Sequence, residues 1–407
     1  MVLTLEQSAQ RDRERLAKRS RMKFALAAEV GDLPPIVNQE RRLRGERDLL
    51  SFLVEYFPNS TGLAPFGPKQ VRAIRQLEHA ILYSGRFLNL IPRGYCKSSI
   101  SEGACIWAAL YGHRRFILFF GANDESAKSG IESIQTELAT NPLLAEDFPE
   151  VCLPIAKLEN KSMRCASQTY NGLLTYIGWN SEEVVFPTIA GSVASGAVIK
   201  ACGLLSASRG ARHMRPDGTR ARPDLAIIDD PQTDQSAISP PETKKRLRII
   251  RKSILRLGGH GRQISVCTNA TKIADNDLVD QLSDRKQNPG WITIRAETVI
   301  TMPNNFEKLW LGKYSDLLLD FNEEDPNSQA EALGRATEFY RAHFDEMNEG
   351  AEVTWDSVPL EPGEISAIQH ALNIYIIEGE DVFDAECQNN PSRNDIAGYL
   401  QLSASVR

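Results

Sequence analysis

A short stretch of the chain has the residue types and spacing needed to hold a phosphate group. In "LNLIPRGYCKSSISEG" (88–103), an apolar run leads to Arg93-Gly94 and then to Lys97-Ser98. A strand that passes through a loop into a helix N-terminus aims backbone N–H groups at one point, which attracts anions. The lysine would add a positive charge there, and the serine hydroxyl would hold Mg²⁺. The stretch therefore predicts a nucleotide-binding loop over residues 93–99, including Tyr95 and Ser99.

This stretch departs from the general signature Gly-x-x-x-x-Gly-Lys-Ser/Thr. The first glycine is missing, and Cys96 occupies the place of the second. We expect the loop to accept Cys96 because the bend, with its positive φ, lies at Gly94. Arg93 could reach the γ-phosphate as an arginine finger from the same chain. The competing interpretation is a surface Arg-Gly turn followed by an incidental Lys-Ser.

Two adjacent acids supply the second half of a hydrolytic site. In "PDLAIIDDP" (223–231), a short apolar run ends at Asp229-Asp230. We expect Asp229 to anchor the Mg²⁺ shell and Asp230 to orient and polarise the attacking water. Aspartate is one methylene shorter than glutamate, so the water must lie closer or be relayed. The alternative is a strand that simply ends in an Asp-Asp-Pro turn.

Two further signals are weaker. "ISVCTNAT" (264–271) could place the tips of Thr268 and Asn269 beside the γ-phosphate, although a plain strand-end turn has the same pattern. Gln70 could read an adenine edge on which Phe66 stacks, whereas Phe66 could equally be a loop anchor.

These side chains need an α/β framework to bring them together. Short, nearly continuous apolar runs at 86–92, 114–121, 224–231 and 263–271 alternate with helical patterns, which is typical of strands buried on both faces of a parallel sheet. We expect a P-loop NTPase fold with a mainly parallel central sheet flanked by helices. We divide the chain into an N-terminal helical region (1–60), an ATPase core (61–300) and a C-terminal lid or linker subdomain (301–407).

Composition limits the classes of protein to which the chain can belong. The 407 residues include 42% hydrophobic and 25% charged residues, with no apolar run long enough to span a membrane. The seven cysteines include no Cys-x-x-Cys pair, which favours reduced thiols in a cytoplasm. A net charge of −6 excludes a generally basic coat for nucleic acid. Contact with nucleic acid would have to come from local basic patches at 11–23 or 244–256.

The chain resembles the large terminase subunit of tailed bacteriophages. The resemblance rests on "IPRGYCKSS", "RPDLAIIDDPQTDQSAIS", "ISVCTNATKIADNDLVDQL" and "FDAECQNNP", and spans roughly residues 45 to 390. The family's loop often lacks the first glycine of the general signature. By resemblance, the functional loop residues fall on Arg93, Lys97 and Ser98, the paired acids on Asp229 and Asp230, and the coupling motif on Thr268 and Asn269.

This resemblance implies an ATP- and Mg²⁺-dependent motor that threads double-stranded DNA through a portal protein into a prohead, in the cytoplasm of a bacterial host. Its partners would be a small terminase subunit and further copies of itself in a ring, with no membrane involved. Arg209 and Arg212 are candidates for an arginine that acts on a neighbouring subunit, or for a loop that binds solvent or DNA phosphate. The family's usual nuclease domain would begin near residue 391, so we expect no nuclease activity from these residues.

Two other functions remain open. A helicase would share the same core motifs, although no clear set of strand-separation motifs is visible. A non-catalytic DNA- or portal-docking remnant of a prophage terminase is compatible with Cys96 and Asp230, whereas Lys97, Ser98 and Asp229 argue against it.

Overall fold

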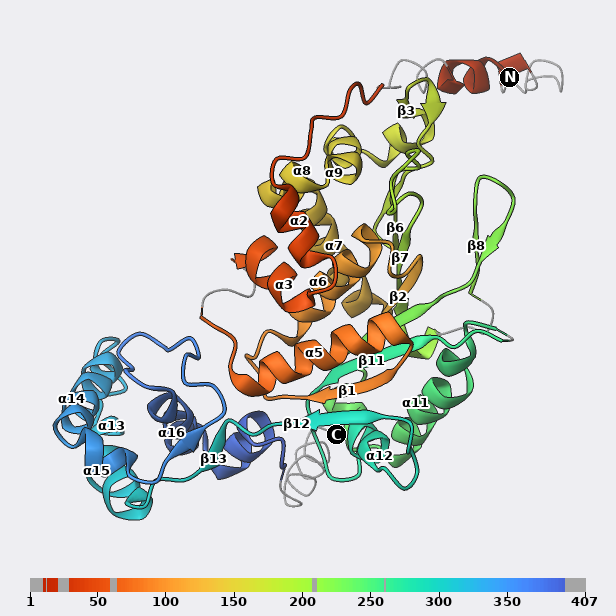
Figure 1. The fold of residues 1–407 in the computed structure, drawn as a ribbon. Helices are drawn as coiled ribbons and strands as arrows, with labels where there is room; N and C mark the ends of the chain where they lie inside the picture. Colours follow the sequence, from red (N-terminus) through yellow and green to blue (C-terminus); the bar gives the residue numbers. More distant parts are fainter. Residues whose placement is uncertain are drawn as a thin grey trace, which may run out of the picture. The chain divides into compact units, whose positions relative to one another are not determined.

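A computed structural model of the chain describes residues 10–11, 13–20, 29–58, 64–206, 211–259 and 261–391. Its main feature is an eight-stranded, mainly parallel sheet with the strand order β12-β1-β11-β10-β2-β7-β6-β5 (Figure 1). The strands are β1 (Arg86–Leu90), β2 (Phe116–Gly121), β5 (Gly178–Asn180), β6 (Glu183–Val185), β7 (Val198–Gly203), β10 (Leu225–Asp229), β11 (Ser265–Ala270) and β12 (Ile292–Arg295).

Strand direction follows the connections. β1 pairs in parallel with both β11 and β12, and β2 pairs in parallel with β7. β6 runs antiparallel to β5 and β7, because a tight turn joins β5 to β6. The central strands β1, β2, β10 and β11 are buried along almost their whole length, which explains why they appear in the sequence as unbroken apolar runs.

The chain divides into two compact units. Unit 1 comprises residues 1–56, 102–226 and 256–264, and unit 2 comprises residues 57–101, 227–255 and 265–407.

In unit 2, helix α5 (Pro68–Tyr83) packs on β1 and β11 (Figure 1). Helix α6 (Lys97–Leu110) begins in this unit and continues into unit 1. The other helices are α10 (Asp234–Ala237), α11 (Pro240–Lys252), α12 (Leu278–Ser283), η4 (Phe306–Tyr314), α13 (Ser315–Leu318), α14 (Ser328–Ala342), α15 (Phe344–Asn348), α16 (Ala367–Glu378), α17 (Glu380–Val382) and η5 (Phe383–Cys387), with η3 (Ile254–Arg256) at the boundary. Strands β13 (Val299–Thr301) and β14 (Glu352–Val353) form a separate pair.

The C-terminal helices of unit 2 have their own apolar core. Trp310, Tyr314 and Tyr340 are fully buried in it, together with Leu372 and Phe383. The three aromatic rings of the first group pack at centroid distances of 4.8 to 6.3 Å. Helices α14 and α15 follow each other within residues 321–350.

In unit 1, helix α7 (Asp124–Thr140) packs on β7 and β2. The other helices are α2 (Gln39–Gly45), α3 (Leu49–Tyr56), α8 (Pro142–Asp147), α9 (Pro149–Ala156), η1 (Ser162–Ser167) and η2 (Leu204–Ser206). Two short antiparallel pairs join β3 (Thr169–Tyr170) to β4 (Leu173–Leu174), and β8 (His213–Met214) to β9 (Arg220–Ala221).

The α/β class and the mainly parallel sheet predicted from the sequence are confirmed, and all eight strands fall between residues 86 and 295. The basic helix expected at the N-terminus is present over residues 10–11 and 13–20, and the rest of the 1–28 stretch lies outside the described residues. At Glu29 the chain instead forms a bridge with Thr169. Within the described ranges, no helix combines the length and the apolar character of a membrane span. The three-part division at residues 60 and 300 stays a prediction.

Candidate functional site

The candidate phosphate loop, residues 91–96, joins the end of β1 directly to the first residue of α6, which is Lys97. The predicted order of strand, loop and helix is therefore present. Two loop residues have left-handed backbone conformations, Gly94 at φ 81° and Cys96 at φ 57°. Our expectation that Cys96 avoids positive φ is wrong, because the chain needs a second left-handed residue to turn into α6. This conformation favours glycine, which is the residue that the general signature has at the position of Cys96.

The ammonium group of Lys97 points back to the start of the loop. Its Nζ donates to the carbonyl oxygens of Ile91 at 2.9 Å and Pro92 at 2.8 Å, and the residue is only 8% exposed. Burial lowers the pKa of Lys97, while the nearby carboxylates of Asp230 and Asp229 oppose that effect. Lys97 is thus held buried at the N-terminus of α6, where the negative charges of Asp229 and Asp230 favour its ammonium form.

Ser98 and Asp229 meet in unit 2, as a shared Mg²⁺ site would require. The Asp229 carboxylate, at the end of β10, accepts a hydrogen bond from the Ser101 hydroxyl on α6 at 2.8 Å, and the Ser98 hydroxyl lies close to the same carboxylate. Burial raises the pKa of Asp229 to about 6; the charge of Asp230 acts in the same direction, and the nearby Ser98 hydroxyl acts in the opposite one. A hydroxyl and a carboxylate oxygen are hard ligands that suit Mg²⁺. Ser99, the next residue of the predicted loop set, is half-buried.

A hydrogen-bond chain connects Asp229 to the neighbouring strand β11 and, through it, to β1. Ser101 Oγ accepts a bond from Asn269 Nδ2 at 2.6 Å, and Asn269 Oδ1 accepts one from Asn89 Nδ2 at 2.9 Å. Asn89 and Asn269 are register partners on β1 and β11, so their side chains leave the sheet on the same face. We call Asn89, Asn269, Ser101 and Asp229 the polar relay. Ser101 and Asn89 were not singled out from the sequence, although Ser101 follows Ser98 by one helical turn and Asn89 interrupts an apolar run.

Thr268 does not join this relay. Adjacent residues of a strand point to opposite faces of the sheet, so Thr268 faces away from Asn269. The Thr268 hydroxyl is fully buried, and no hydrogen-bond partner for it is found among the described residues. The structure therefore brings only the asparagine of the predicted coupling pair toward Asp229.

Asp230 has an unusual backbone conformation at the strand end. Its φ is 40°, in the left-handed region that few non-glycine residues adopt, and Pro231 follows it. Its N–H donates to the carbonyl of Asn269 at 2.9 Å, which fixes the turn against β11. Asp230 is exposed, beside the half-buried Asp229. Strain of this kind often occurs where a side chain must be aimed at a ligand.

Arg93 points to a late segment of the chain. Its guanidinium forms an ion pair with Glu386 of η5 at 2.9 Å, and its backbone N–H donates to the Glu386 carbonyl at 3.2 Å. The Arg93 side chain is 77% exposed, so the pair is weak and can be exchanged for another anion. Asn389 fixes the same segment by donating to the carbonyls of Leu90 and Ala296. Glu386 is a neighbour of the loop that the sequence alone left unassigned.

The Gln70 side chain holds the backbone of the loop at Tyr95. Gln70 is fully buried; its Oε1 accepts the Gly67 N–H at 2.8 Å and its Nε2 donates to the Tyr95 carbonyl at 3.3 Å. The Tyr95 ring packs edge-on against Trp355 at 5.1 Å. Both ends of the Gln70 amide are thus engaged within the protein, and the reading of an adenine edge by Gln70, with Phe66 half-buried beside it, stays a prediction.

The basic patch at 244–256 lies on helices α11 and η3. On α11, Leu247 and Ile250 are buried, whereas Lys244, Lys245, Arg248 and Lys252 are exposed. Arg246, which sequence reasoning passed over, is instead buried and donates to the Pro231 carbonyl at 2.9 Å. It therefore fixes the turn that follows the paired acids.

The two candidates for an arginine acting on a neighbouring subunit are not both described. Arg209 lies outside the described residues, and Arg212 is an exposed residue of unit 1 next to β8.

Across the described ranges, no group of three or more His, Cys, Asp or Glu side chains could hold a metal ion by itself. Comparison of the chain with protein-family models and with curated proteins found no match.

Proposed function

We propose that the chain hydrolyses ATP at the candidate phosphate loop and uses that reaction to move double-stranded DNA during viral packaging. The observation that carries the hydrolytic part is the convergence of Lys97 and Ser98, at the start of α6, on Asp229 at the end of β10. The packaging part rests on the resemblance of the four sequence motifs to the large terminase subunit.

In this proposal each residue has a separate role. The N-terminus of α6 and Lys97 attract the phosphates, since a helix N-terminus and a cation act on the same anion. Arg93 leaves Glu386 to contact the γ-phosphate, at small cost because the pair is exposed. Asp230 orients the attacking water.

Ser98 and Asp229 fit a magnesium ion, because both offer oxygen atoms at one point and Asp229 is largely desolvated there. When bound, the ion would neutralise charge on the phosphate oxygens.

The test is ATP hydrolysis by the full chain, alone, with linear duplex DNA and with single-stranded DNA. We expect hydrolysis that duplex DNA stimulates. A preference for single strands together with unwinding would favour a helicase. Absence of hydrolysis under all three conditions would favour the docking remnant and contradict the proposal.

A further inference from the structure

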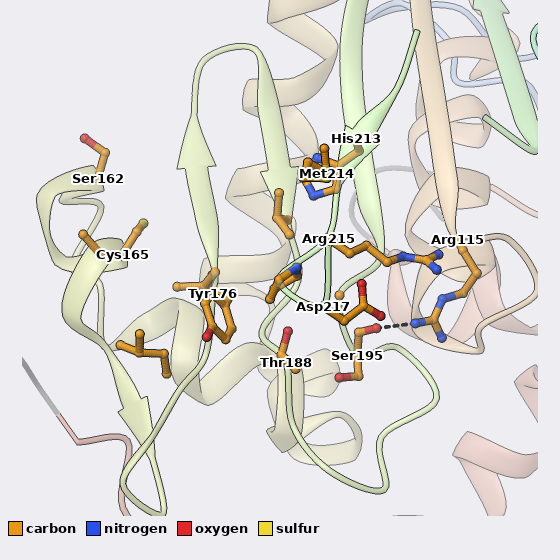
Figure 2. Close-up of a pocket in the computed structure, with 16 residues that line it drawn as sticks. Arg115, Ser162, Cys165, Tyr176, Thr188, Ser195, His213, Met214, Arg215 and Asp217 are labelled. Atoms are coloured by element: carbon orange, nitrogen blue, oxygen red, sulfur yellow. Dashed lines mark hydrogen bonds between the residues drawn. The ribbon is translucent and has the colours of Figure 1, made fainter. Parts of the chain in front are cut away.

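A cavity of about 740 Å³ lies within unit 1, beside the β8–β9 hairpin (Figure 2). Segments from η1, from the stretch after β6 and from the hairpin turn contribute to its wall, together with Arg115 just before β2. The residues with ionisable side chains that matter here are Arg115, His213, Arg215 and Asp217. None of these residues belongs to the candidate phosphate loop or to the polar relay.

Arg115 is a fixed cation in the cavity wall. Its Nη1 donates to the Val193 carbonyl at 2.7 Å, and its Nη2 donates to the Ser195 carbonyl (Figure 2). A guanidinium has five N–H donors, so other donors remain for a ligand. The position of this cation is set by the backbone rather than by an acid.

Asp224 does not hydrogen-bond to the Arg115 guanidinium, although its negative charge raises the pKa of that group. Asp224 accepts the backbone N–H groups of Arg115 at 2.8 Å and Phe116 at 3.0 Å, so its two oxygens fix the start of β2. Among the residues that the structure describes, no carboxylate forms an ion pair with Arg115 or Arg215.

A second guanidinium, that of Arg215, converges on the first. Figure 2 shows both side chains pointing to the same side of the cavity. Burial lowers the pKa of Arg115, and the positive charge of Arg215 lowers it further. Two like charges held this way repel each other in the free protein, and an anion between them would relieve the repulsion.

Asp217, the carboxylate in the cavity wall, already accepts hydrogen bonds within its own turn. One oxygen of Asp217 accepts both the N–H and the hydroxyl of Thr219, at 2.8 and 2.6 Å, within the turn of the hairpin. His213 adds a further donor, 3.9 Å from Glu183. Two guanidinium groups and one carboxylate therefore line this cavity.

We propose that this cavity binds a phosphate group between Arg115 and Arg215. Phosphate suits the pair better than a single carboxylate, because its oxygen atoms point away from a tetrahedral centre in different directions and can accept from two guanidinium forks at once. Tyr176, Ile177 and Met214 line the remaining wall and would contact the uncharged part of a larger ligand. The phosphate can be free or a monoester, or belong to a nucleic-acid backbone, which the exposed hairpin residues Arg212 and Arg220 would also contact.

The test is equilibrium dialysis of labelled inorganic phosphate against the full-length wild-type protein and its variants. Arg215→Gln should weaken one class of site by about tenfold or more, because a charge-assisted hydrogen bond is lost. Arg220→Gln removes the same charge from the same hairpin outside the cavity wall and should leave that site unchanged. The proposal would be overturned if Arg215→Gln and Arg220→Gln weakened phosphate binding equally. It would also be overturned if Arg215→Gln did not reduce the amount of bound phosphate.

Two further variants keep the result interpretable. Arg115→Lys keeps the charge but loses the planar fork, and should weaken the same class of site. Lys97→Ala should leave it intact, so that failure of this site and failure of the proposed ATP site are told apart. Competition with short duplex DNA then identifies the source. Displacement of phosphate supports a backbone phosphate, whereas retention supports a free phosphate or a monoester.

Discussion

At the scale of single residues, the loop depends on a cysteine held in a conformation that glycine prefers. Cys96 has φ 57° and packs, half-buried, beside Ile91 and Tyr95. A β-branched side chain tolerates this region least. We therefore expect Cys96→Val to lower the free energy of unfolding by about 1–3 kcal/mol more than Cys96→Gly does. Urea denaturation of both variants measures the difference, and equal losses would show that the backbone at this position is not left-handed.

Some residue roles could be predicted from the sequence and others could not. Lys97 and Ser98 are identifiable because their chemistry depends on adjacent residues and on a helix start, which local sequence determines. The backbone conformation of Cys96 could not be predicted, since it depends on how β1 enters α6. The position of Glu386 beside Arg93 could not be predicted either, because it depends on how a segment distant in the sequence folds.

At the scale of elements, the polar relay connects β1, β11 and β10 through α6. Ser101 is fully buried and is both donor to Asp229 and acceptor from Asn269. We expect Ser101→Ala to cost about 1–3 kcal/mol of stability, because it leaves the buried side-chain amide donor of Asn269 without its acceptor. Ser99→Ala, two residues nearer the helix start, should cost under about 0.5 kcal/mol. Chemical denaturation compares the two, and a similar cost for both would contradict a structural role of the relay.

The strands of the sheet were predictable because burial on both faces leaves an apolar run that is visible in the sequence. The relay was not predicted, although Asn89 stands out as a polar residue within such a run. Its partners come from β11 and α6, and strand order is needed to see that they meet. Similarly, the buried side of α11 was predictable from its periodicity, but the contact of Arg246 with Pro231 was not.

Helix α16 carries an ion pair that makes stability depend on pH. His370 Nδ1 lies 2.7 Å from Glu364, and this hydrogen bond raises the pKa of His370 above its ordinary value of 6.5. The contribution is complete below pH 6.5 and is lost as pH rises through the folded-state pKa. We expect His370→Gln to cost about 1 kcal/mol at pH 6 and clearly less at pH 9.

The control for this pair is His79→Gln, because His79 packs against the Tyr83 ring at a centroid distance of 4.8 Å rather than facing a carboxylate. A cost of His370→Gln that is independent of pH would show that the ion pair does not titrate as described.

At the scale of the whole molecule, a net charge of −6 makes local basic surfaces decisive for any contact with DNA. The exposed face of α11 is one such surface. Replacing Lys244, Lys245 and Arg248 with glutamine should weaken DNA-stimulated hydrolysis more at low salt than at high salt, since each phosphate contact releases counterions. The hydrolysis rate as a function of DNA concentration at two ionic strengths measures this, and equal losses at both would argue against contact with phosphates.

The central claim is that the loop between β1 and α6 works with Asp229 as a site of ATP hydrolysis. The most direct measurement compares steady-state ATP hydrolysis by wild type, Lys97→Ala and Lys308→Ala, the last of which removes an exposed lysine of η4. We expect Lys97→Ala to lower the rate by on the order of a hundredfold, because it removes a cation desolvated beside the phosphates, and Lys308→Ala to match wild type. Unchanged hydrolysis in Lys97→Ala would contradict the account.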